Sequence, residues 1–404
     1  MPATPIPLGQ EFYQQPHALY RRLAAAGPAL PVITPDGLPG WLVTSYREGR
    51  ALLADPRLSK DLAKIREALP ADRVGAFASP LMKNMVFSDP PEHTRLRGLV
   101  NRAFTGHAVK RLRPRIARVA DELLDALAAE ASSGESVVDL ITGYARPLAV
   151  AVISELLGVP AADRSDFREW TMNLFFRVGT PAEVAASAAR TSEYLGALIA
   201  ARRAEPRDDL LSELAQVPEG EGGLTHGESL SMAQVLLAAG FETSVNLIGN
   251  GILALLRSPG QLAVLRSDPS LIPGAVEEFL RYDSPAHLAT LRVTTEAVPV
   301  GNVEIPPGQL VFISLLAANR DSDRFPEPDR LDVTRQPGGH MAFGHGIHHC
   351  VGAPLARLEG QIAFERLLSR FPDLALAEPT ALSWGNSALM HGLQSLPVRP
   401  TAAA

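Results

Sequence analysis

The longest apolar stretch of the chain, residues 229–256, constrains the fold more than any other feature. As a helix it would be long enough to cross a membrane. Polar side chains interrupt it, however, at Gln234, Glu242, Asn246 and Asn250. Such side chains are costly against lipid but can be satisfied inside a protein. We therefore expect a long central helix around which the other elements pack.

The composition supplies enough apolar material to cover such a helix. Of the 404 residues, 46% are hydrophobic and 20% are charged, which excludes a disordered chain. The net charge of -6 gives no general attraction for nucleic acid or an anionic membrane. The first ten residues contain three prolines and no basic segment before an apolar one, so we expect neither a signal peptide nor a membrane anchor. The single cysteine excludes a disulfide within the chain, and we expect a cytoplasmic protein.

The spacing of the apolar residues predicts a mainly helical fold with small β-sheets. We expect helices over residues 14–26, 47–54, 275–282 and 354–371, and a run of amphipathic helices over 95–203 with breaks at Gly134, Gly158 and Gly179. A strand is expected over residues 41–46 and a hairpin over 298–315. The sequence contains neither a flexible linker nor an internal repeat, so residues 1–404 are expected to form a single domain, and we expect a monomer.

The only cysteine, Cys350, lies in the segment FGHGIHHCVG, residues 343–352, directly before an expected helix. Pro354 suits the first turn of that helix. At this place the free amide groups and the positive end of the helix dipole favour a thiolate over a thiol with the usual pKa of about 8.5. The glycines of the segment let the backbone turn sharply and approach a flat ligand. The segment therefore predicts a metal ligand or a nucleophile, and a macrocycle fits it.

The residues alone leave two other interpretations of this segment open. A lone cysteine is often a small buried apolar residue, although the glycine-rich loop and the helix start argue against it here. A zinc site has candidate ligands in His345, His348 and His349 beside Cys350. Their spacings match neither the CxxC nor the HExxH pattern of known zinc sites.

The segment 343–352 resembles the cysteine-ligand loop of the cytochrome P450 superfamily, whose members are haem-thiolate monooxygenases. Further family patterns occur elsewhere in the sequence, in the order in which the family has them. The resemblance extends from about Gly40 to Pro400. It implies a helix-rich, prism-shaped cytochrome P450 fold with a long central helix over the haem. It also implies a soluble bacterial enzyme of the actinobacterial type, in which Cys350 is the axial ligand of haem b, iron protoporphyrin IX.

The segment AGFET, residues 239–243, resembles the acid and alcohol motif of the family. The Thr243 hydroxyl could bond its own backbone and open the helix locally. Ala239 and Thr243 are four residues apart, so both can face one ligand. The resemblance implies that Thr243 holds the bound oxygen, that Glu242 relays protons, and that Ala239 leaves space for O2. The alternative is that Thr243 is a buried hydroxyl satisfied by its own helix.

His93 and Arg97 are four residues apart, which places two donor groups on one helical face where they favour an anion. They resemble the residues that hold the haem propionates in the family, together with matches at Arg292 and His348. The cofactor-binding set that the resemblance implies is His93, Arg97, Ala239, Arg292, Phe343, Gly344, His348, Cys350 and Gly352.

Glu278 and Arg281 are three residues apart on an expected helix, a spacing that is usually a solvated surface pair. Taken with Arg330, they resemble a buried network of the family that locks the cysteine loop. Removing one partner of such a network is strongly destabilising. We therefore expect Glu278, Arg281 and Arg330 to have a structural role.

The family's cavity-lining segments contain apolar side chains in this sequence, including methionines that adapt to bulky ligands. They are Met82, Met85, Phe87, Phe175, Phe176, Leu236, Ala239, Leu288, Leu389 and Met390. The resemblance implies insertion of one oxygen atom from O2 into a C–H bond, by hydroxylation or epoxidation. A polyketide or macrolide, a terpenoid and a steroid are all compatible substrates.

Because the sequence contains no flavin or iron–sulfur segment, we expect electrons from a ferredoxin and its NAD(P)H-dependent reductase. A basic run could steer that acidic partner or form a solvated face. It comprises Arg95, Arg102, Lys110, Arg111, Arg113, Arg115 and Arg118. Two other functions stay open, a peroxygenase that uses H2O2 directly and a non-catalytic haem sensor. The sensor would need the cysteine loop but not Glu242 and Thr243.

Overall fold

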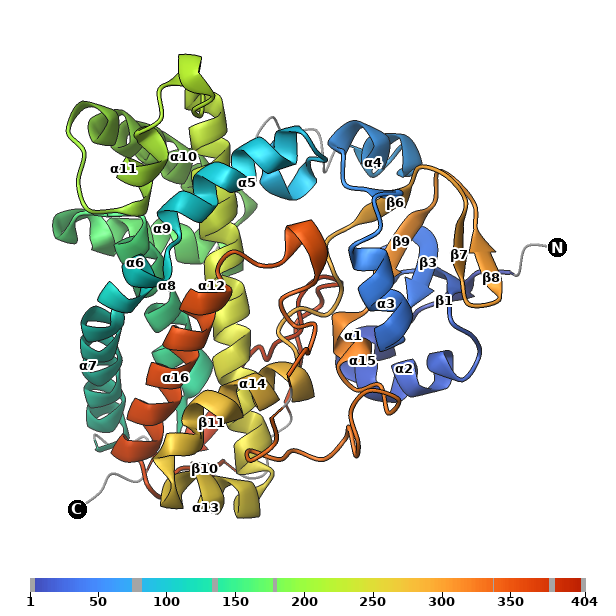
Figure 1. The fold of residues 1–404 in the computed structure, drawn as a ribbon. Coiled ribbons are helices and arrows are strands. Elements are labelled where there is room, and N and C mark those ends of the chain that lie inside the picture. Colours follow the sequence, from blue (N-terminus) through green and yellow to red (C-terminus); the bar gives the residue numbers. More distant parts are fainter. Residues whose placement is uncertain are drawn as a thin grey trace.

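The computed structural model describes residues 4–74, 82–132, 137–176, 180–336, 338–377 and 382–400. Helices and the three-stranded sheet fill one side of the molecule, and the largest sheet and the two-stranded sheet lie on the other side with the N-terminal helices (Figure 1). Helix α12 (His226–Leu256) runs through the helical side next to α16 (Ala353–Arg370). The mainly helical fold with small sheets and one long central helix is confirmed.

Helix α12 begins at a capping box. The Thr225 side chain accepts a hydrogen bond from the Glu228 amide at 3.1 Å, and the Glu228 carboxylate accepts one from the Thr225 amide at 2.9 Å. These bonds satisfy two of the amide groups that a helix start leaves free. Among the described helices, α12 alone is long and apolar enough to cross a membrane, but 67% of its most apolar window is buried in the protein. It is therefore a core helix.

Several helices pack directly on α12, among them α8 (Arg146–Leu156), α10 (Pro181–Ala204), α14 (Ile272–Tyr282) and α16. Glycines on α12 permit close contact, since a Cβ at Gly251 would lie 2.5 Å from the Phe364 ring of α16. Buried side chains of all these helices form one hydrophobic cluster. The other helices on this side are α5 (Glu92–Ala103), α6 (Gly106–Arg111), α7 (Arg113–Ser132), a π-helix (Ile141–Ala145), α9 (Arg164–Phe176), α11 (Leu210–Ala215) and α13 (Pro259–Ser267).

The largest sheet joins early and late parts of the chain in the strand order β1-β2-β3-β9-β6-β4. Strand β9 pairs in parallel with β3, with Val311 opposite Trp41, and antiparallel with β6, with Val311 opposite Arg292. Two smaller sheets have the orders β10-β11-β5 and β7-β8. The strands are β1 (Ile6–Pro7), β2 (Leu30–Ile33), β3 (Pro39–Val43), β4 (Leu58–Ser59), β5 (Val138–Asp139), β6 (Arg292–Thr294), β7 (Val298–Val300), β8 (Val303–Ile305), β9 (Leu310–Ile313), β10 (Ala375–Leu376) and β11 (Pro397–Arg399).

Short helices cover the large sheet and bury its apolar side chains in two further clusters. They are α1 (Glu11–Gln14), α2 (Pro16–Ala24), α3 (Tyr46–Leu53), α4 (Leu62–Ala68) and α15 (Leu315–Ala318). This arrangement places the segment 285–292, which leads into β6, along the site described below, so that the sheet side contributes one wall of it.

Two predicted elements are wrong in part. The strand expected over residues 41–46 ends at Val43, and α3 begins at Tyr46. Residues 298–315 were expected as one hairpin, but the hairpin consists only of β7 and β8. After a turn at Gly308, where φ is +74°, the chain continues as β9 and inserts between β3 and β6. The break at Gly158 is confirmed, since α8 ends just before it and its φ is +75°. The predicted breaks at Gly134 and Gly179 lie outside the described residues.

Candidate active site

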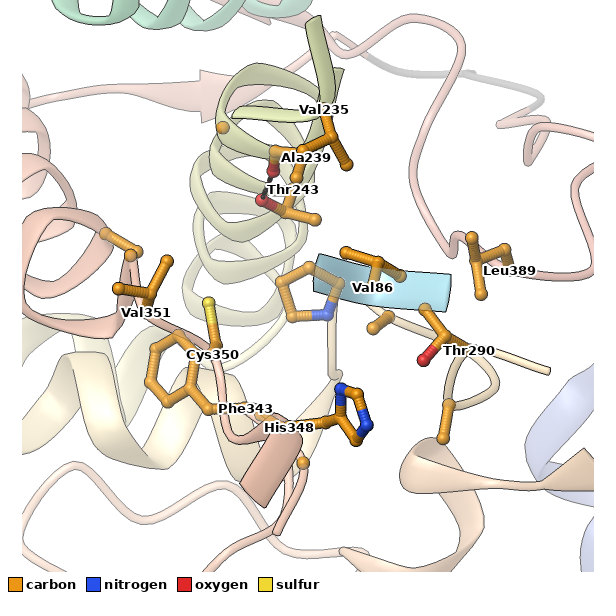
Figure 2. Close-up of a pocket in the computed structure, with 18 of the residues that line it drawn as sticks. Val86, Val235, Ala239, Thr243, Thr290, Phe343, His348, Cys350, Val351 and Leu389 are labelled. Atoms are coloured by element: carbon orange, nitrogen blue, oxygen red, sulfur yellow. Dashed lines mark hydrogen bonds between the residues drawn. The ribbon is translucent and has the colours of Figure 1, made fainter. Parts of the chain in front are cut away.

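A cavity with about 1500 Å³ of empty space, part of it open to solvent, lies beside α12 (Figure 2). One wall is the face of α12 that presents Ala239 and Thr243. The opposite boundary is the loop that contains Cys350, and a third is the segment around Thr290. Most of the other lining side chains are apolar. The cavity therefore offers a reactive sulfur and a hydroxyl within a largely apolar enclosure.

The Cys350 loop is shaped by glycine and by backbone hydrogen bonds. Gly346 has a φ of +75°, and a Cβ there would lie 2.8 Å from the Leu53 carbonyl oxygen, so a larger residue would not fit. The Cys350 amide donates to the Phe343 carbonyl at 2.9 Å. Helix α16 then begins at Ala353 with Pro354 in its first turn, as predicted. In Figure 2 the sulfur of Cys350 points from this loop into the cavity.

The pKa of the Cys350 thiol is raised, which is opposite to the direction predicted from its place before a helix. The thiol has surface accessible from the cavity, but it lies deep among protein atoms, and this burial is the largest effect on its pKa. The Gly352 amide and the Arg97 cation act in the other direction and lower the pKa less than burial raises it. The protein alone therefore does not hold Cys350 as a thiolate.

Five basic side chains converge at one edge of the cavity. Four are the predicted His93, Arg97, Arg292 and His348, whose two imidazole rings lie 4.1 Å apart between centroids. The fifth is Lys60, which sequence reasoning missed because it comes from the segment after β4 and its neighbours give no motif. Lys60 is 2% exposed, and its Nζ donates to the Thr290 hydroxyl at 2.6 Å.

Within the part of the chain that the structure describes, these five side chains form no ion pair, although the Asp89 carboxylate acts to raise the pKa of Lys60 and of His93. Arg97 donates to the Asn101 side-chain oxygen at 2.9 Å, and Arg292 donates to the Thr290 carbonyl at 2.7 Å. Burial, followed by repulsion from Lys60 and the other cations, lowers the pKa of His348 to about 2, and burial lowers the pKa of Arg292 to about 10. The Arg97 and Arg292 cations have no ion-pair partner among the described residues, and such cations favour an anionic ligand. This donor set fits a group with two carboxylates, such as the propionates of haem.

Thr243 lines the cavity, and its hydroxyl donates to the Ala239 carbonyl one turn earlier at 3.0 Å (Figure 2). The helix nevertheless stays regular across these residues, so the predicted local opening is wrong. Glu242 is not among the lining residues. Burial raises the pKa of its carboxyl, and the Arg146 cation opposes this rise.

A second acid near the cavity was missed. Ser244 lines the cavity, and its hydroxyl donates to Glu359 Oε2 at 2.8 Å. Glu359 is 2% exposed, and its Oε1 is buried without a described hydrogen-bond partner. Burial raises the pKa of Glu359 to about 7. One signal could have found it, because Glu359 falls on the apolar stripe of α16 between Leu355 and Ile362.

The predicted buried network forms around Glu278 and Arg281, but Arg330 is not its third side chain. Glu278 and Arg281 are both 0% exposed and form two hydrogen bonds, of 2.7 and 2.8 Å. The second arginine is Arg335, whose Nε lies 3.3 Å from Glu278 Oε1. The Arg330 side chain is 56% exposed and pairs with Glu327 and Asp332. The Arg330 side chain points to solvent. Its carbonyl faces the network and accepts a hydrogen bond from Arg281.

The network reaches the cysteine loop through Asn319. Arg281 donates to the Asn319 carbonyl at 3.1 Å. The Asn319 side-chain oxygen accepts from the Met341 amide at 2.6 Å, and the Gly344 amide donates to the Met341 carbonyl at 2.8 Å. This chain of bonds ties the base of the Cys350 loop to α14.

The nine residues predicted to bind the cofactor all line the cavity. Of those predicted to bind substrate, Met85, Leu236, Ala239, Leu288, Leu389 and Met390 line it as well. Met82 and Phe87 do not line it. Phe87 packs instead against the hydrophobic cluster over the large sheet, and its neighbour Val86 lines the cavity. The side chains of Phe175 and Phe176 lie outside the described part of the chain. Sequence reasoning also missed Ile153, Val235 and Thr290.

A family model described as cytochrome P450 matches residues 41–268 and 265–378. Cytochrome P450 107B1 of Saccharopolyspora erythraea is 50% identical over 397 residues, which cover 97% of this chain and 96% of that protein. Cytochrome P450 monooxygenase PikC of Streptomyces venezuelae is 48% identical over 394 residues, covering 97% and 92%. The ligand-free structure of the P450 monooxygenase TamI has a TM-score of 0.91 and 46% identity, covering 99% of this chain and 95% of that one.

The fold, the cavity and these similarities show that the chain belongs to the cytochrome P450 family. It is a soluble haem-dependent monooxygenase of the bacterial type. Enzymes of this family ligate the haem iron with a cysteine thiolate, use O2 and receive electrons from a redox partner while a small molecule is oxidised.

Proposed function

We propose that this cytochrome P450 oxygenates a bulky apolar polyketide or macrolide held in the cavity, by hydroxylation of a C–H bond or epoxidation of a C=C bond. The single observation that supports this most is the large, mainly apolar cavity that has Cys350 on one wall and Thr243 on another. Two relatives support the substrate class. One is 6-deoxyerythronolide B hydroxylase of Saccharopolyspora erythraea, which is 42% identical over 99% of both chains. The other is TamI bound to tirandamycin C, at 47% identity.

The cofactor is haem b, with Cys350 as the iron ligand and the five basic side chains around the propionates. When bound, haem supplies the activation of O2 that makes oxygen insertion possible. The positive charges of Arg97 and Arg292 would neutralise the carboxylates, and Lys60, whose pKa burial lowers well below its usual value, would add a further hydrogen-bond donor. Cys350 would hold the haem iron as a thiolate, a form that bound metal would favour and that the buried protein environment by itself disfavours.

The residues of α12 position the substrate and move protons. Ala239 is small and leaves space on the cavity side of the helix. The Thr243 hydroxyl holds its proton at Oγ1, at present in a bond to the Ala239 carbonyl, and can turn toward the cavity. Glu242 and Glu359 are the two acids beside this segment, and Glu359 reaches the cavity through Ser244. Glu359 can exchange a proton near neutral pH because its pKa is about 7.

The electron donors are a ferredoxin and its NAD(P)H-dependent reductase, and the cytoplasm is where such partners are available. Part of the basic run supports docking of an acidic protein. Arg102, Lys110, Arg113 and Arg118 are exposed, and the described residues give them no ion-pair partner. Arg95, Arg111 and Arg115 instead pair with Glu228, Asp208 and Glu155.

Residues 1–404 form one domain in this proposal, supported by the pairing of β3 with β9 and β5 with β11.

The test is spectroscopic. The reduced protein with carbon monoxide should show the red-shifted Soret band that thiolate ligation produces, and Cys350→Ser should abolish it. The same protein, titrated with macrolides, linear polyketides, terpenoids and steroids, should show a shift of the Soret band with a polyketide or macrolide. A Cys350→Ser protein that keeps the band would refute the ligand assignment, and a response to steroids or terpenoids alone would refute the substrate class.

A further inference from the structure

Three side chains from distant parts of the chain meet outside the cavity. His17 belongs to α2, Asp283 directly follows α14, and His391 lies in the C-terminal segment after residue 382. The Nε2 of His17 lies 2.9 Å from Asp283 Oδ1, and the Nε2 of His391 lies 3.2 Å from the same oxygen. All three atoms lie within 4.8 Å of one another. None of the three residues lines the cavity.

The imidazole of His391 is fixed and its nitrogen is unsatisfied. The ring stacks on Trp384 with centroids 3.9 Å apart and planes 10° apart. Its side chain is only 3% exposed, and its Nε2 has no hydrogen-bond partner in the described structure although it faces Asp283. A buried polar nitrogen without a partner is unfavourable. A cation between His391 and Asp283 would satisfy it.

The backbone around these residues is held in place from α12. Asn250 donates through Nδ2 to the His391 carbonyl at 2.9 Å and to the Asp283 carbonyl at 3.3 Å. The His391 amide donates to the Pro285 carbonyl at 2.8 Å. One asparagine side chain therefore bridges the two segments that contain Asp283 and His391. Such support from outside the ligand set keeps metal ligands in position.

The spacing and the donor types match a divalent transition metal. A tetrahedral Zn²⁺ ion bound at about 2.0–2.1 Å has ligand atoms about 3.3 Å apart, close to the two distances found here. Two imidazoles and one carboxylate are ordinary Zn²⁺ ligands that leave a fourth position for water. His17 has a 22% exposed side chain, which provides access for that water and for the metal.

The nearby Arg320 is paired with Asp329 at 2.9 Å, which offsets its positive charge beside the three proposed ligands.

We propose that His17, Asp283 and His391 form a binding site for a divalent transition-metal ion, best matched by Zn²⁺. The metal joins α2, the end of α14 and the C-terminal segment. Leu389 and Met390, which line the cavity, directly precede His391. Metal binding therefore fastens one wall of the cavity to the N-terminal helices. Without metal, Asp283 would only share a hydrogen bond with His17 and an ion pair with His391, so the experiment must separate these cases.

The experiment uses the full-length, tag-free, haem-loaded protein. It is treated with a chelator, dialysed against micromolar Zn²⁺, and analysed for zinc and iron per chain by mass spectrometry. The variants are His17→Ala and Asp283→Asn, and the control is His107→Ala, which removes an exposed histidine. We expect about one zinc per chain in the wild type and the control. Loss of a ligand should weaken binding by more than the roughly 10- to 100-fold that loss of a supporting residue costs.

The partly exposed His17 makes His17→Ala the variant that should fold best, and its iron content and circular dichroism verify the fold. Zn²⁺ should also raise the melting temperature of the wild type and the control but not that of His17→Ala, because only the folded protein contains the site. A wild type that binds no zinc would overturn the proposal. So would equal zinc in His17→Ala and wild type, because the metal would then be bound elsewhere, for example by His345 and His349.

Discussion

Ser244 on the central helix donates a 2.8 Å hydrogen bond to Glu359, a fully enclosed carboxyl on the helix that follows the cysteine loop. The bond joins α12 to α16 directly behind the cavity wall. It also leaves the second oxygen of Glu359 without a described partner. A carboxyl group in this environment keeps its proton to a higher pH than an exposed one. Glu359 can therefore hold a proton next to the cavity.

Glu359 should make stability depend on pH. Its folded pKa is about 7, above the unfolded value near 4.5, so the folded state binds more protons between these values. Its contribution is present below pH 4.5 and is lost as the pH rises through 7, a fall of about 3 kcal/mol in the free energy of unfolding. Urea unfolding of the haem-loaded protein from pH 5 to 8 measures it. Glu359→Gln should remove this slope, whereas Glu365→Gln, an exposed position on α16, should keep it. An unchanged slope in Glu359→Gln would mean that the carboxyl is ionised throughout.

Lys60 should contribute to haem retention. It is the cation of the propionate cluster that no motif indicated, and a charge-assisted bond is worth about 1.5–3 kcal/mol. Lys60→Met should therefore release haem roughly 10- to 100-fold faster in a transfer assay to an excess of a haem acceptor. Lys64→Met is the control, since Lys64 is 50% exposed and is not among the cavity-lining residues. Equal release rates for the two variants would remove Lys60 from the cofactor site.

Thr243→Ala should uncouple electron use from oxygenation. The variant keeps the apolar cavity, so it should bind substrate and consume NAD(P)H through its redox partners. Without the hydroxyl, more of the electrons should appear as H2O2, and product per NAD(P)H should fall by about 100-fold, the lower end of the range that positioned proton transfer contributes. Thr243→Ser keeps the hydroxyl and should restore much of the ratio. A Thr243→Ala enzyme with the wild-type ratio would show that the hydroxyl serves only its bond to Ala239.

Arg281 and Arg330 should differ sharply in their effect on stability. Arg281→Met leaves the buried Glu278 carboxylate without its bidentate partner and should cost about 3–5 kcal/mol. Arg330→Ala removes an exposed side chain and should change stability by less than about 0.5 kcal/mol. Denaturant unfolding of both variants gives the comparison. Similar losses for the two would contradict the assignment of Arg335 as the second arginine of the network.

Local patterns were sufficient to predict the elements that depend on neighbours in sequence. Two such elements are α12 and the Cys350 loop. The apolar and polar residues of α12, and the proline and glycines around Cys350, determine the backbone structure within one or two turns of their own position. The nine predicted cofactor residues could be named because they belong to short motifs, and they line one cavity as a consequence of where those motifs pack. Their roles in binding haem remain proposals that the experiments above test.

Only the tertiary structure decided the contacts between segments far apart in the chain. Arg335 and not Arg330 reaches Glu278, because the turn after residue 330 determines which side chain faces inward. Lys60 joins the cationic cluster because β4 pairs with β6, and Glu359 meets Ser244 because α16 packs on α12. His17, Asp283 and His391 become neighbours for the same reason. Side-chain spacing within a helix or strand follows from backbone geometry, whereas contacts between distant elements depend on how whole surfaces pack together.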